Sequence, residues 1–324
     1  MKRTLGKGGV DVSALGMGCW AIGGPFRMGT LEAGWGTVDD DESVRAVQAA
    51  VAAGVTFFDT AANYGAGHSE RVLGRAVAAD RAAVALATKF GYDVDEADRR
   101  VHGVDASPEA VRRSCEASLR RLGTDYLDLF QFHVGDFPLP EVDGVLETLE
   151  ALVAEGKIRA YGWSTDDPQR AGRFAAGPHC VSVQHQLNVL EDNPTMLTLC
   201  ERKGLASINR GPLAMGLLTG KYAAGADFEA TDVRRSGPEW LKYFRDGQPS
   251  PEWLGRLEAV REVLTSNGRT PSQGALAWLW ARSPATLPIP GFRTVRQVEE
   301  NAGAIAYGPL TPEQMGEVER LLGR

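Results

Sequence analysis

Four side chains with reactive groups stand at or near the ends of short apolar runs. Asp59 is the second-to-last residue of the run GVTFFDT, and Tyr64 follows within a few residues. Lys89 stands near the end of AVALATKF, and His133 closes YLDLFQFH. An ammonium is costly to bury alone, so we expect Lys89 to pair with the carboxylate of Asp59.

Together these four groups suit the reduction of a carbonyl. A hydride that reaches the carbonyl carbon leaves charge on the oxygen, which needs a proton donor and stabilising hydrogen bonds. We expect the ammonium of Lys89 to lower the pKa of Tyr64 and make it a better acid. Asp59 would keep Lys89 charged, and His133 would position the carbonyl. Each residue taken alone also has an ordinary structural interpretation, as a cap, a rim residue, a solvated charge or a core histidine.

The elements that carry these groups decide whether they meet. Short apolar runs alternate with amphipathic stretches, a pattern typical of parallel βαβ units. Strands are predicted at 13–19, 54–60, 83–90, 126–133, 158–164, 180–186, 204–210 and 285–291. Eight such strands predict a closed (β/α)8 TIM barrel, in which reactive residues lie at the C-terminal ends of the strands. The four side chains would then share one face.

Helices are predicted between these strands, some with clear end signals. The predicted helices with defined ranges are 69–79, 107–123, 142–157 and 294–305. Ser107 is expected to cap the second of these, with Pro108 in its first turn and Gly123 after its end. Ser69 is the expected cap of the first.

One segment interrupts the alternation of strands and helices. Residues 211–251 form a long mixed stretch rich in Gly, Pro and charge, which predicts a long functional loop after strand seven. The chain shows neither a linker nor a low-complexity tract, so residues 1–324 are expected to form a single barrel domain.

Composition excludes several classes of function. The 324 residues are 43% hydrophobic and 24% charged, with a net charge of -7. The sequence has no dense Lys/Arg stripe for a nucleic acid and no apolar run that could cross a membrane. Its N-terminal residues lack the apolar stretch of a signal peptide. A cytoplasmic enzyme acting on a small molecule is therefore expected, and the oligomeric state stays open.

Other cofactor and metal motifs do not match. A dinucleotide fingerprint fails in LGMGCWAIGG, because Ala21 replaces the third glycine after Gly16 and Gly18. HExxH is missing, the histidines lack a familiar metal spacing, and no cysteines form a CxxC pair, so no metal is expected. The cysteines, interpreted as free thiols, are Cys19, Cys115, Cys180 and Cys200.

Over nearly its whole length the chain resembles the aldo-keto reductase superfamily. FFDTAANYG carries that family's Asp and Tyr, LATKFG carries its Lys, and LGTDYLDLFQFH ends in its His, in the family's order. The resemblance implies a (β/α)8 barrel with NADP(H) extended across its mouth. It also implies NADPH-dependent reduction of an aldehyde or ketone to an alcohol, with Tyr64 as the proton donor. This family uses no dinucleotide fingerprint.

The resemblance further implies a set of cofactor contacts. Ser164 in YGWST and Gln184 in VSVQHQ would hold the nicotinamide carboxamide, and Arg210 would stack on its ring. Residues expected along the pyrophosphate are Gly211, Pro212, Leu213, Gly216 and Lys221. Those expected around the adenosine are Gly291, Arg293, Gln297, Glu300 and Asn301, with Arg293 as the main reader of the 2′-phosphate. Trp20 and Asp59 complete the cofactor set. The expected substrate contacts are Trp20, Phe26, Tyr92 and parts of the loop after Gly211.

The sequence departs from the family's pattern in four places. Thr165 follows the strand-five serine, and Arg210 replaces a common aromatic residue, although a guanidinium can also stack on a ring. Trp163 and the segment HVGDF after His133 also differ, and these two differences concern the shape of the substrate rather than the chemistry.

Two other functions stay open. The same four groups would serve an NAD-linked sugar or alcohol dehydrogenase that runs in the oxidative direction. A cofactor-sensing, non-catalytic binding subunit is the second alternative, although a sensor need not retain the complete catalytic set. Neither the physiological substrate nor a strict choice between NADP and NAD follows from the sequence.

Overall fold

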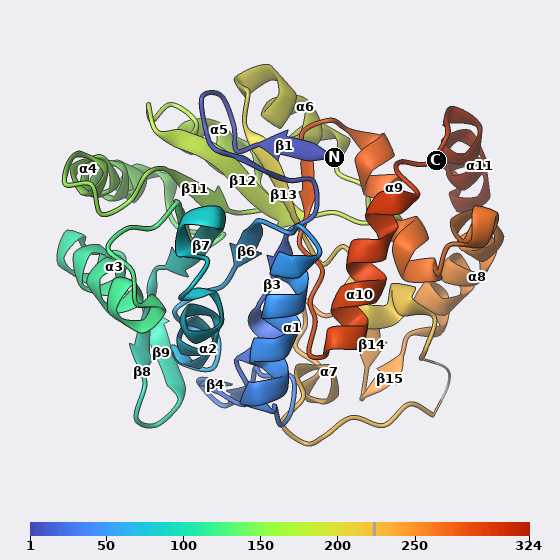
Figure 1. Ribbon diagram of the computed structural model, residues 1–324, viewed down its shortest axis with the longest axis horizontal. Helices are drawn as coiled ribbons and strands as arrows, with labels where there is room; N and C mark the ends of the chain where they lie inside the picture. Colours follow the sequence, from blue (N-terminus) through green and yellow to red (C-terminus); the bar gives the residue numbers. More distant parts are fainter. Residues whose placement is uncertain (223–224) are drawn as a thin grey trace.

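The computed structural model describes residues 1–222 and 225–324, and its centre is a single eight-stranded parallel sheet (Figure 1). The strands follow one another around the sheet in chain order. They are β3 (Met17–Gly18), β6 (Phe57–Asp59), β7 (Ala85–Phe90), β10 (Leu129–Phe132), β11 (Tyr161–Ser164), β12 (Cys180–Gln186), β13 (Ala206–Arg210) and β16 (Thr286–Pro288). Each lies within a predicted strand.

The sheet closes on itself between its first and last strands. Gly18 and Gly291 form a parallel bridge, and the N–H of Gly18 donates to the carbonyl of Pro290 at 3.0 Å. A Cβ on Gly18 would lie 2.8 Å from the carbonyl oxygen of Ile289, so this seam requires a glycine. The predicted (β/α)8 barrel is confirmed. Gly16 and Gly18 do not complete a dinucleotide fingerprint. Gly18 ends β3 at this seam, and Gly16 directly precedes β3 and donates to the carbonyl of Pro288 at 3.0 Å.

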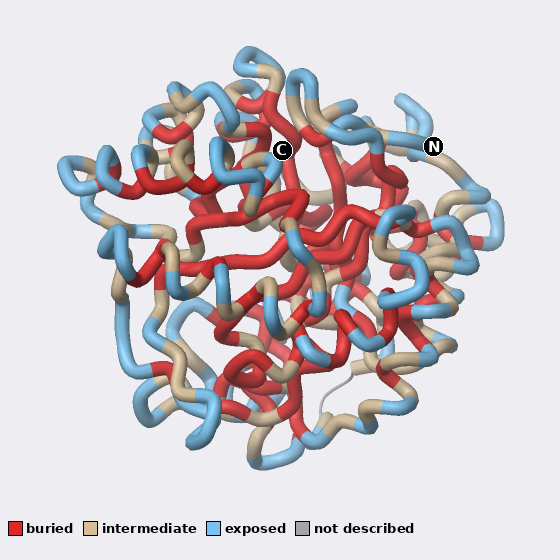
Figure 2. The backbone as a smooth tube through the Cα atoms, turned by 60° about the vertical axis from the view of Figure 1, so that its left-hand side comes forward, coloured by how far each residue is buried: buried red, intermediate tan, exposed pale blue. Residues whose placement is uncertain are grey.

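Helices surround the barrel, and their outer faces are exposed while the strands between them are buried (Figures 1 and 2). Among the described residues, one helix follows each of the first six barrel strands, two helices of more than ten residues lie between β13 and β16, and two helices follow β16. In chain order they are α1 (Asp40–Ala52), α2 (His68–Val77), α3 (Pro108–Leu122), α4 (Val142–Ala154), α5 (Pro168–Phe174), α6 (Pro194–Lys203), α8 (Pro251–Thr265), α9 (Pro271–Arg282), α10 (Val295–Gly303) and α11 (Pro312–Leu322).

The helix ends test two of the predicted caps. Ser107 accepts a hydrogen bond from the N–H of Ala110, with Pro108 at the first turn of α3 and Gly123 left-handed after its end, as predicted. The prediction that Ser69 caps α2 is wrong, because the helix begins earlier and its N-cap is Gly67. Ser69 lies within the helix and is buried. Its hydroxyl donates a hydrogen bond to the backbone carbonyl of Cys19, the residue after β3.

A hairpin covers the N-terminal end of the barrel. Its strands are β1 (Lys2–Thr4) and β2 (Asp11–Ser13), paired antiparallel. Leu5 and Val12, each 2% exposed, pack in one apolar cluster with residues of the barrel strands such as Phe57, Leu129 and Ile208. This end is therefore filled with apolar side chains, and the opposite, C-terminal end carries the polar groups.

Short elements build up the C-terminal end. A four-stranded sheet joins β4 (Arg27–Met28), β5 (Leu31–Glu32), β8 (Tyr92–Asp95) and β9 (Arg100–Val104). The predicted long loop after β13 holds a 3-10 helix (Ala214–Thr219), α7 (Val233–Ser236), β14 (Phe244–Arg245) and β15 (Gln248–Pro249).

A buried cation contacts several side chains of this loop. The guanidinium of Arg234 pairs with the carboxylate of Asp232 at 2.6 Å, and both side chains are less than one-tenth exposed. The same guanidinium lies 4.1 Å from the ring centre of Phe228 and 4.7 Å from that of Trp35. Cation–π contacts of this kind strengthen when they are shielded from water, so Arg234 links the loop to the segment after β3.

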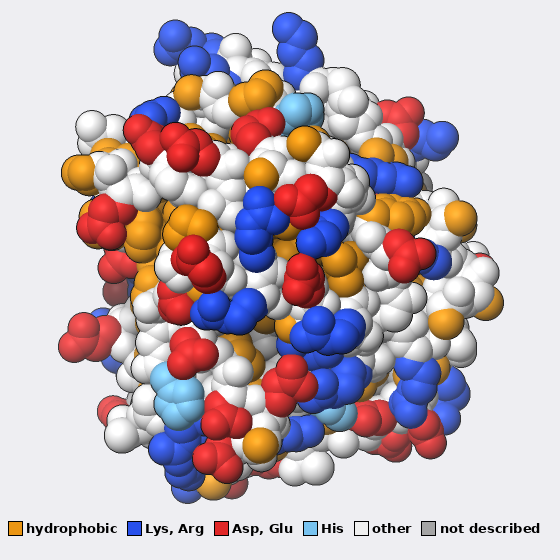
Figure 3. Space-filling view, turned by 90° about the vertical axis from the view of Figure 1, so that its left-hand side faces the viewer, with side chains coloured by type: hydrophobic (Ala, Val, Ile, Leu, Met, Phe, Trp, Pro, Cys, Tyr) orange, Lys and Arg blue, Asp and Glu red, His pale blue; other side chains and the backbone are white. Residues whose placement is uncertain are grey.

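The surface agrees with the mixed charge of the sequence. On the face that Figure 3 shows, acidic and basic side chains lie among one another rather than in separate areas of one sign. Within residues 1–222 and 225–324, no helix has both the length and the apolar character needed to cross a membrane.

Candidate active site

The ammonium of Lys89 lies at the centre of the polar groups at the C-terminal end. Its side chain is 0% exposed, and its Nζ donates to Asp59 Oδ1 at 2.5 Å, to the carbonyl of Thr60 at 2.8 Å and to the hydroxyl of Tyr64 at 3.1 Å. The expected pair with Asp59 is therefore present. An ammonium has three N–H donors, and each has an acceptor here.

Asp59 is held on its other side by two amides. Its Oδ2 accepts from Gln131 Nε2 and from Gln184 Nε2, each at 2.8 Å. Sequence reasoning placed Gln184 at the cofactor and missed Gln131 altogether. The signal for Gln131 was available, since it stands two residues before His133 on the same face of a strand and is polar within an apolar run.

The pKa of Tyr64 differs from the expectation. Burial raises the pKa of its phenol, and although the charge of Lys89 acts to lower the pKa, burial outweighs it. The predicted net lowering is therefore wrong for the free protein, while the predicted direction of the Lys89 effect holds. Burial acts to lower the pKa of Lys89 itself, but Asp59 and Tyr64 outweigh burial and raise that pKa. Lys89 is thus held as a cation.

His133 lies just beyond β10, with its ring edge-on to the ring of Tyr64 at 5.8 Å between centres. Burial, with the charges of Lys89 and Arg210, lowers the pKa of His133 well below 6.5, so the ring is neutral. Its Nδ1 lies 3.1 Å from Asn63 Oδ1, and Asn63 is 5% exposed. With this amide orientation Nδ1 donates and Nε2 is left as an acceptor. Sequence reasoning did not identify Asn63.

Several aromatic rings lie near Tyr64 and His133. Trp20 stacks beside Tyr64 with 5.8 Å between ring centres, and Trp240, which is 53% exposed, lies 6.2 Å from Trp20. Tyr92 is partly buried in the same region. Phe26 is only 3% exposed and belongs to a small apolar cluster, so of the three expected aromatic substrate contacts it is the one withdrawn from the surface.

The residues expected around the nicotinamide stand on adjacent strands. Ser164 ends β11 and is 6% exposed, and no hydrogen bond of its hydroxyl occurs in the part of the chain that the structure describes. Gln184 lies beside it in register on β12. Arg210 ends β13, in register with Gln186 on β12. These side chains therefore share one edge of the barrel mouth.

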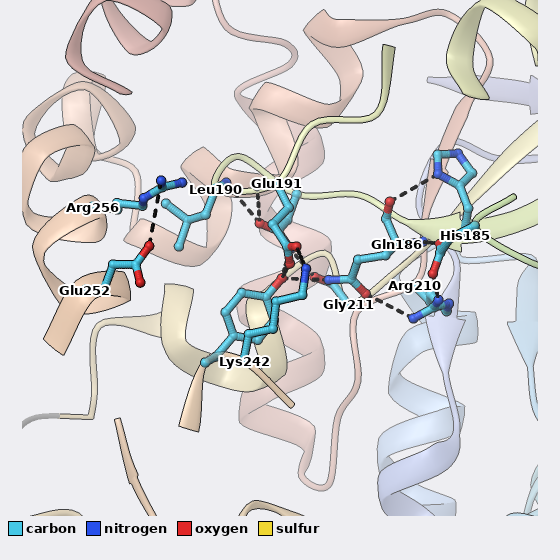
Figure 4. Close-up of polar contacts among 12 residues, drawn as sticks. His185, Gln186, Leu190, Glu191, Arg210, Gly211, Lys242, Glu252 and Arg256 are labelled. Carbon is cyan, nitrogen blue, oxygen red and sulfur yellow. Dashed lines mark hydrogen bonds and ion pairs between the residues drawn. The ribbon is translucent and has the colours of Figure 1, made fainter. Parts of the chain in front are cut away.

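Arg210 is held by two partners that sequence reasoning missed. Its Nη1 donates to Gln186 Oε1 at 3.2 Å, and its Nη2 makes an ion pair with Asp166 in the loop after β11 (Figure 4 shows Arg210 and Gln186). Gln186 in turn donates to the hydroxyl of Tyr243 at 2.7 Å. A Cβ on Gly211 would lie 2.6 Å from Gln186 Oε1, so this glycine makes room for the contact.

The residues expected along the pyrophosphate follow β13. Pro212 and Leu213 are buried, Gly211 and Gly216 have left-handed φ angles of 62° and 93°, and Lys221 is exposed. Left-handed turns in succession leave the backbone close to the rim, where a phosphate could approach.

The residues expected around the adenosine stand at β16 and α10. Gln297 accepts from the N–H of Arg293 at 2.7 Å, and Asn301 donates to the carbonyl of Gly291 at 3.4 Å. Glu300 is partly buried, and its carbonyl accepts from Gln273 at 3.1 Å.

Two sets of hydrogen bonds in this region affect how a phosphate could be bound. The guanidinium of Arg293 donates to the carbonyls of Trp35, at 3.0 Å, and Thr37. The first N–H of α10, on Val295, donates to the carboxylate of Glu42 at 3.0 Å, so this helix terminus already holds an anionic group. One N–H at the start of α10 is thus already occupied, whereas the guanidinium of Arg293 keeps N–H groups that could bind a phosphate.

The expected cofactor residues fit an extended anionic ligand. Apart from Trp20 and Asp59, they lie on or after β11, β12, β13 and β16, which are consecutive in the sheet, and β16 is followed by the bridge to β3 at the seam. Three cations follow these strands in chain order, Arg210 at the end of β13, Lys221 in the loop after it and Arg293 after β16. A ligand that lies along these strand ends would have its reactive end near Lys89 and its phosphates near the cations.

Comparison with known proteins supports the same interpretation. Residues 14–322 match the model of the Aldo/keto reductase family. Aldo-keto reductase str7 from Strobilurus tenacellus is 32% identical over 318 residues, which are 96% of this chain and 89% of that protein.

Two solved structures are also similar. Glycerol dehydrogenase AKR11B4 from Gluconobacter oxydans has a TM-score of 0.81 and 31% identity over 100% of this chain and 95% of that chain. An aldo-keto reductase from Klebsiella pneumoniae in complex with NADPH has a TM-score of 0.72 and 28% identity over 99% and 95% of the two chains.

The buried pair yields a stability prediction. Lys89→Met leaves the carboxylate of Asp59 without its cation, which should lower the free energy of unfolding by about 3–5 kcal/mol. The double variant Asp59→Leu with Lys89→Met removes both charges and should recover much of this loss. Urea denaturation of the wild type and the two variants measures both effects. A double variant no more stable than Lys89→Met would show that charge burial is not the cause.

A pH dependence follows from the neutral ring of His133. Below about pH 6.5 the unfolded chain binds a proton at this residue, whereas the folded protein does not, because its pKa is lower. The free energy of unfolding should therefore fall as the pH drops, by up to about 1.4 kcal/mol per pH unit from this group. His133→Gln should flatten the dependence in urea denaturation between neutral and mildly acid pH. His102→Gln, whose ring lies at the surface, is the control, and equal slopes in all three proteins would contradict the assignment.

Proposed function

Because the chain belongs to the aldo/keto reductase family, a family of oxidoreductases, we propose that it reduces an aldehyde or ketone to the alcohol with NADPH. One observation carries the proposal. The hydroxyl of Tyr64 accepts from the ammonium of Lys89 at 3.1 Å, and the other two N–H groups of that ammonium are occupied by Asp59 and Thr60. The proton of Tyr64 is therefore the one that remains to be donated.

The proton transfer follows from these contacts. Bound NADPH would supply the hydride to the carbonyl carbon. Tyr64 donates its proton to the carbonyl oxygen, which completes the alcohol, and the phenolate left behind is stabilised by Lys89. Tyr64 regains a proton from water after the product leaves. Burial makes the free phenol a weak acid, so the fixed ammonium is what favours loss of its proton.

His133 would position the substrate. A neutral ring adds no further positive charge beside Lys89, and it can donate to a carbonyl oxygen only through an Nε2–H. That tautomer requires Asn63 to turn its amide N–H toward Nδ1, the reverse of the orientation that leaves Nε2 as an acceptor. Trp20 and Tyr92 would enclose the substrate, which favours carbonyl compounds with an apolar or ring-shaped body.

Different residues would bind different parts of the cofactor. Ser164, Gln184 and Arg210 would hold the nicotinamide end. The segment from Gly211 to Lys221 would follow the pyrophosphate, and Arg293 would bind the 2′-phosphate of the adenosine.

Alcohol oxidation is the second candidate. The structure with a TM-score of 0.81 is a glycerol dehydrogenase, whose name describes the oxidative direction. The same groups serve both directions, because Tyr64 would then accept the proton of the alcohol. A cytoplasmic location stays a prediction.

The role of Tyr64 is tested by removing its hydroxyl. Tyr64→Phe should lower turnover by ~10²–10⁴-fold, the usual loss when a general acid is removed, and leave NADPH affinity nearly unchanged. A panel of aldehydes, diketones and sugars with NADPH gives the rates, and fluorescence titration gives the affinity. Tyr92→Phe is the comparison, since its hydroxyl does not contact Lys89. Turnover of Tyr64→Phe within about threefold of the wild type would remove Tyr64 from this role.

Cofactor choice tests Arg293. The wild type should prefer NADPH over NADH, and Arg293→Ala should lower the ratio of the two kcat/KM values by about tenfold or more, as expected for a charge-assisted bond of ~1.5–3 kcal/mol. The guanidinium retains N–H groups beyond those bound to Trp35 and Thr37. Arg296→Ala, an exposed position three residues along, is the control and should change the ratio less. A wild-type ratio below unity would support the NAD-linked dehydrogenase instead.

A further inference from the structure

The guanidinium of Arg210 is fixed in position before any ligand binds. Asp166 pairs with its Nη2, and Gln186 accepts from its Nη1 at 3.2 Å. Asp166 is itself positioned, because its Oδ1 accepts from the backbone N–H of Gln186 at 2.7 Å. The carboxylate thus joins the end of β12 to the guanidinium at the end of β13.

The second partner of Arg210 is anchored in the long loop. Gln186 donates to the hydroxyl of Tyr243, which also accepts from Asn188 at 2.8 Å and donates to Glu191 (Figure 4 shows Gln186 and Glu191). Tyr243 is 4% exposed. Gln186 therefore cannot turn away from Arg210 without breaking a partly buried hydrogen bond, which restricts the guanidinium.

We propose that Asp166 neutralises Arg210 so that the oxidised nicotinamide binds nearly as well as the reduced one. The inference rests on the proposed function, in which Arg210 lies against the nicotinamide. The ring of NADP+ carries a positive charge and that of NADPH does not. A bare guanidinium would repel only the oxidised ring, and the carboxylate of Asp166 offsets this repulsion.

The charge of Arg210 does reach the reacting groups. It acts to lower the pKa of His133 and the pKa of Tyr64, in each case after larger effects of burial and of Lys89. A ligand ring placed among these side chains would therefore feel the same charge. The side chains of Arg210 and Asp166 are 40% and 49% exposed, so water screens the pair, and we expect a moderate effect rather than a large one.

Asp166 would then be a specificity-determining residue for the redox state of the cofactor. With the carboxylate present, NADP+ binds well enough to support alcohol oxidation. Without it, NADP+ is weakened selectively and reduction is favoured. Asp166 acts through Arg210 in this scheme and does not itself touch the reacting atoms.

The experiment measures the affinity of the intact protein for NADP+ and for NADPH separately, by calorimetry. Asp166→Asn preserves the shape and the acceptor for the Gln186 N–H but removes the charge. It should weaken NADP+ binding by about tenfold and change NADPH binding by less than about twofold. Asp166→Glu retains the charge and should keep the wild-type ratio of the two affinities. Asp136→Asn, which removes one exposed charge from the loop after β10, is the control.

A double-mutant cycle tests whether Asp166 acts through Arg210. If the two charges offset each other, removing both should act like keeping both, so the double variant Arg210→Ala with Asp166→Asn should return the ratio of the two affinities to near the wild-type value. Equal weakening of both cofactors in Asp166→Asn, or a double variant that keeps the affinity ratio of Asp166→Asn, overturns the inference alone. A wild type that binds neither cofactor overturns the proposed function as well, so the two failures are distinguishable.

Discussion

The burial of the Lys89 ammonium is the constraint on which the rest of the site depends. A charge that is withdrawn from water costs several kcal/mol unless it is paired and fully hydrogen-bonded. The chain meets this requirement with the carboxylate of Asp59 from the neighbouring strand, and with Thr60 and Tyr64 from the turn that follows it. The turn after β6 must therefore fold back over the end of β7, which brings the phenol of Tyr64 to the barrel mouth.

The same requirement extends across the barrel. Asp59 needs partners for its second oxygen, and these come from Gln131 on β10 and Gln184 on β12. β6 and β12 are not neighbours in the sheet, so the contact between Asp59 and Gln184 exists only because the sheet closes. The seam at Gly18 and Gly291, far from these side chains in sequence, is thus a condition for the hydrogen bonds around the carboxylate.

Three cations at or near the mouth are each paired with a carboxylate. Lys89, Arg210 and Arg234 each hold a carboxylate, at Asp59, Asp166 and Asp232 in that order. Burial and the charges of Lys89 and Arg210 nevertheless lower the pKa of His133 and keep its ring neutral. A neutral imidazole beside a fixed ammonium is suited to orienting a carbonyl, because it contributes hydrogen bonding without competing for the proton of the phenol.

The sequence by itself determined the strands, the parallel barrel, the ends of α3 and the pairing of Lys89 with Asp59. These depend on period, on capping residues and on the shared edge of adjacent parallel strands, all of which are local or follow from strand order. Only the tertiary structure decided that Gln131 and Asn63 serve Asp59 and His133. It alone also decided that Asp166 holds Arg210 and that burial outweighs Lys89 in the pKa of Tyr64. These outcomes depend on distances and water exclusion between segments remote in the chain, and sequence spacing carries neither quantity.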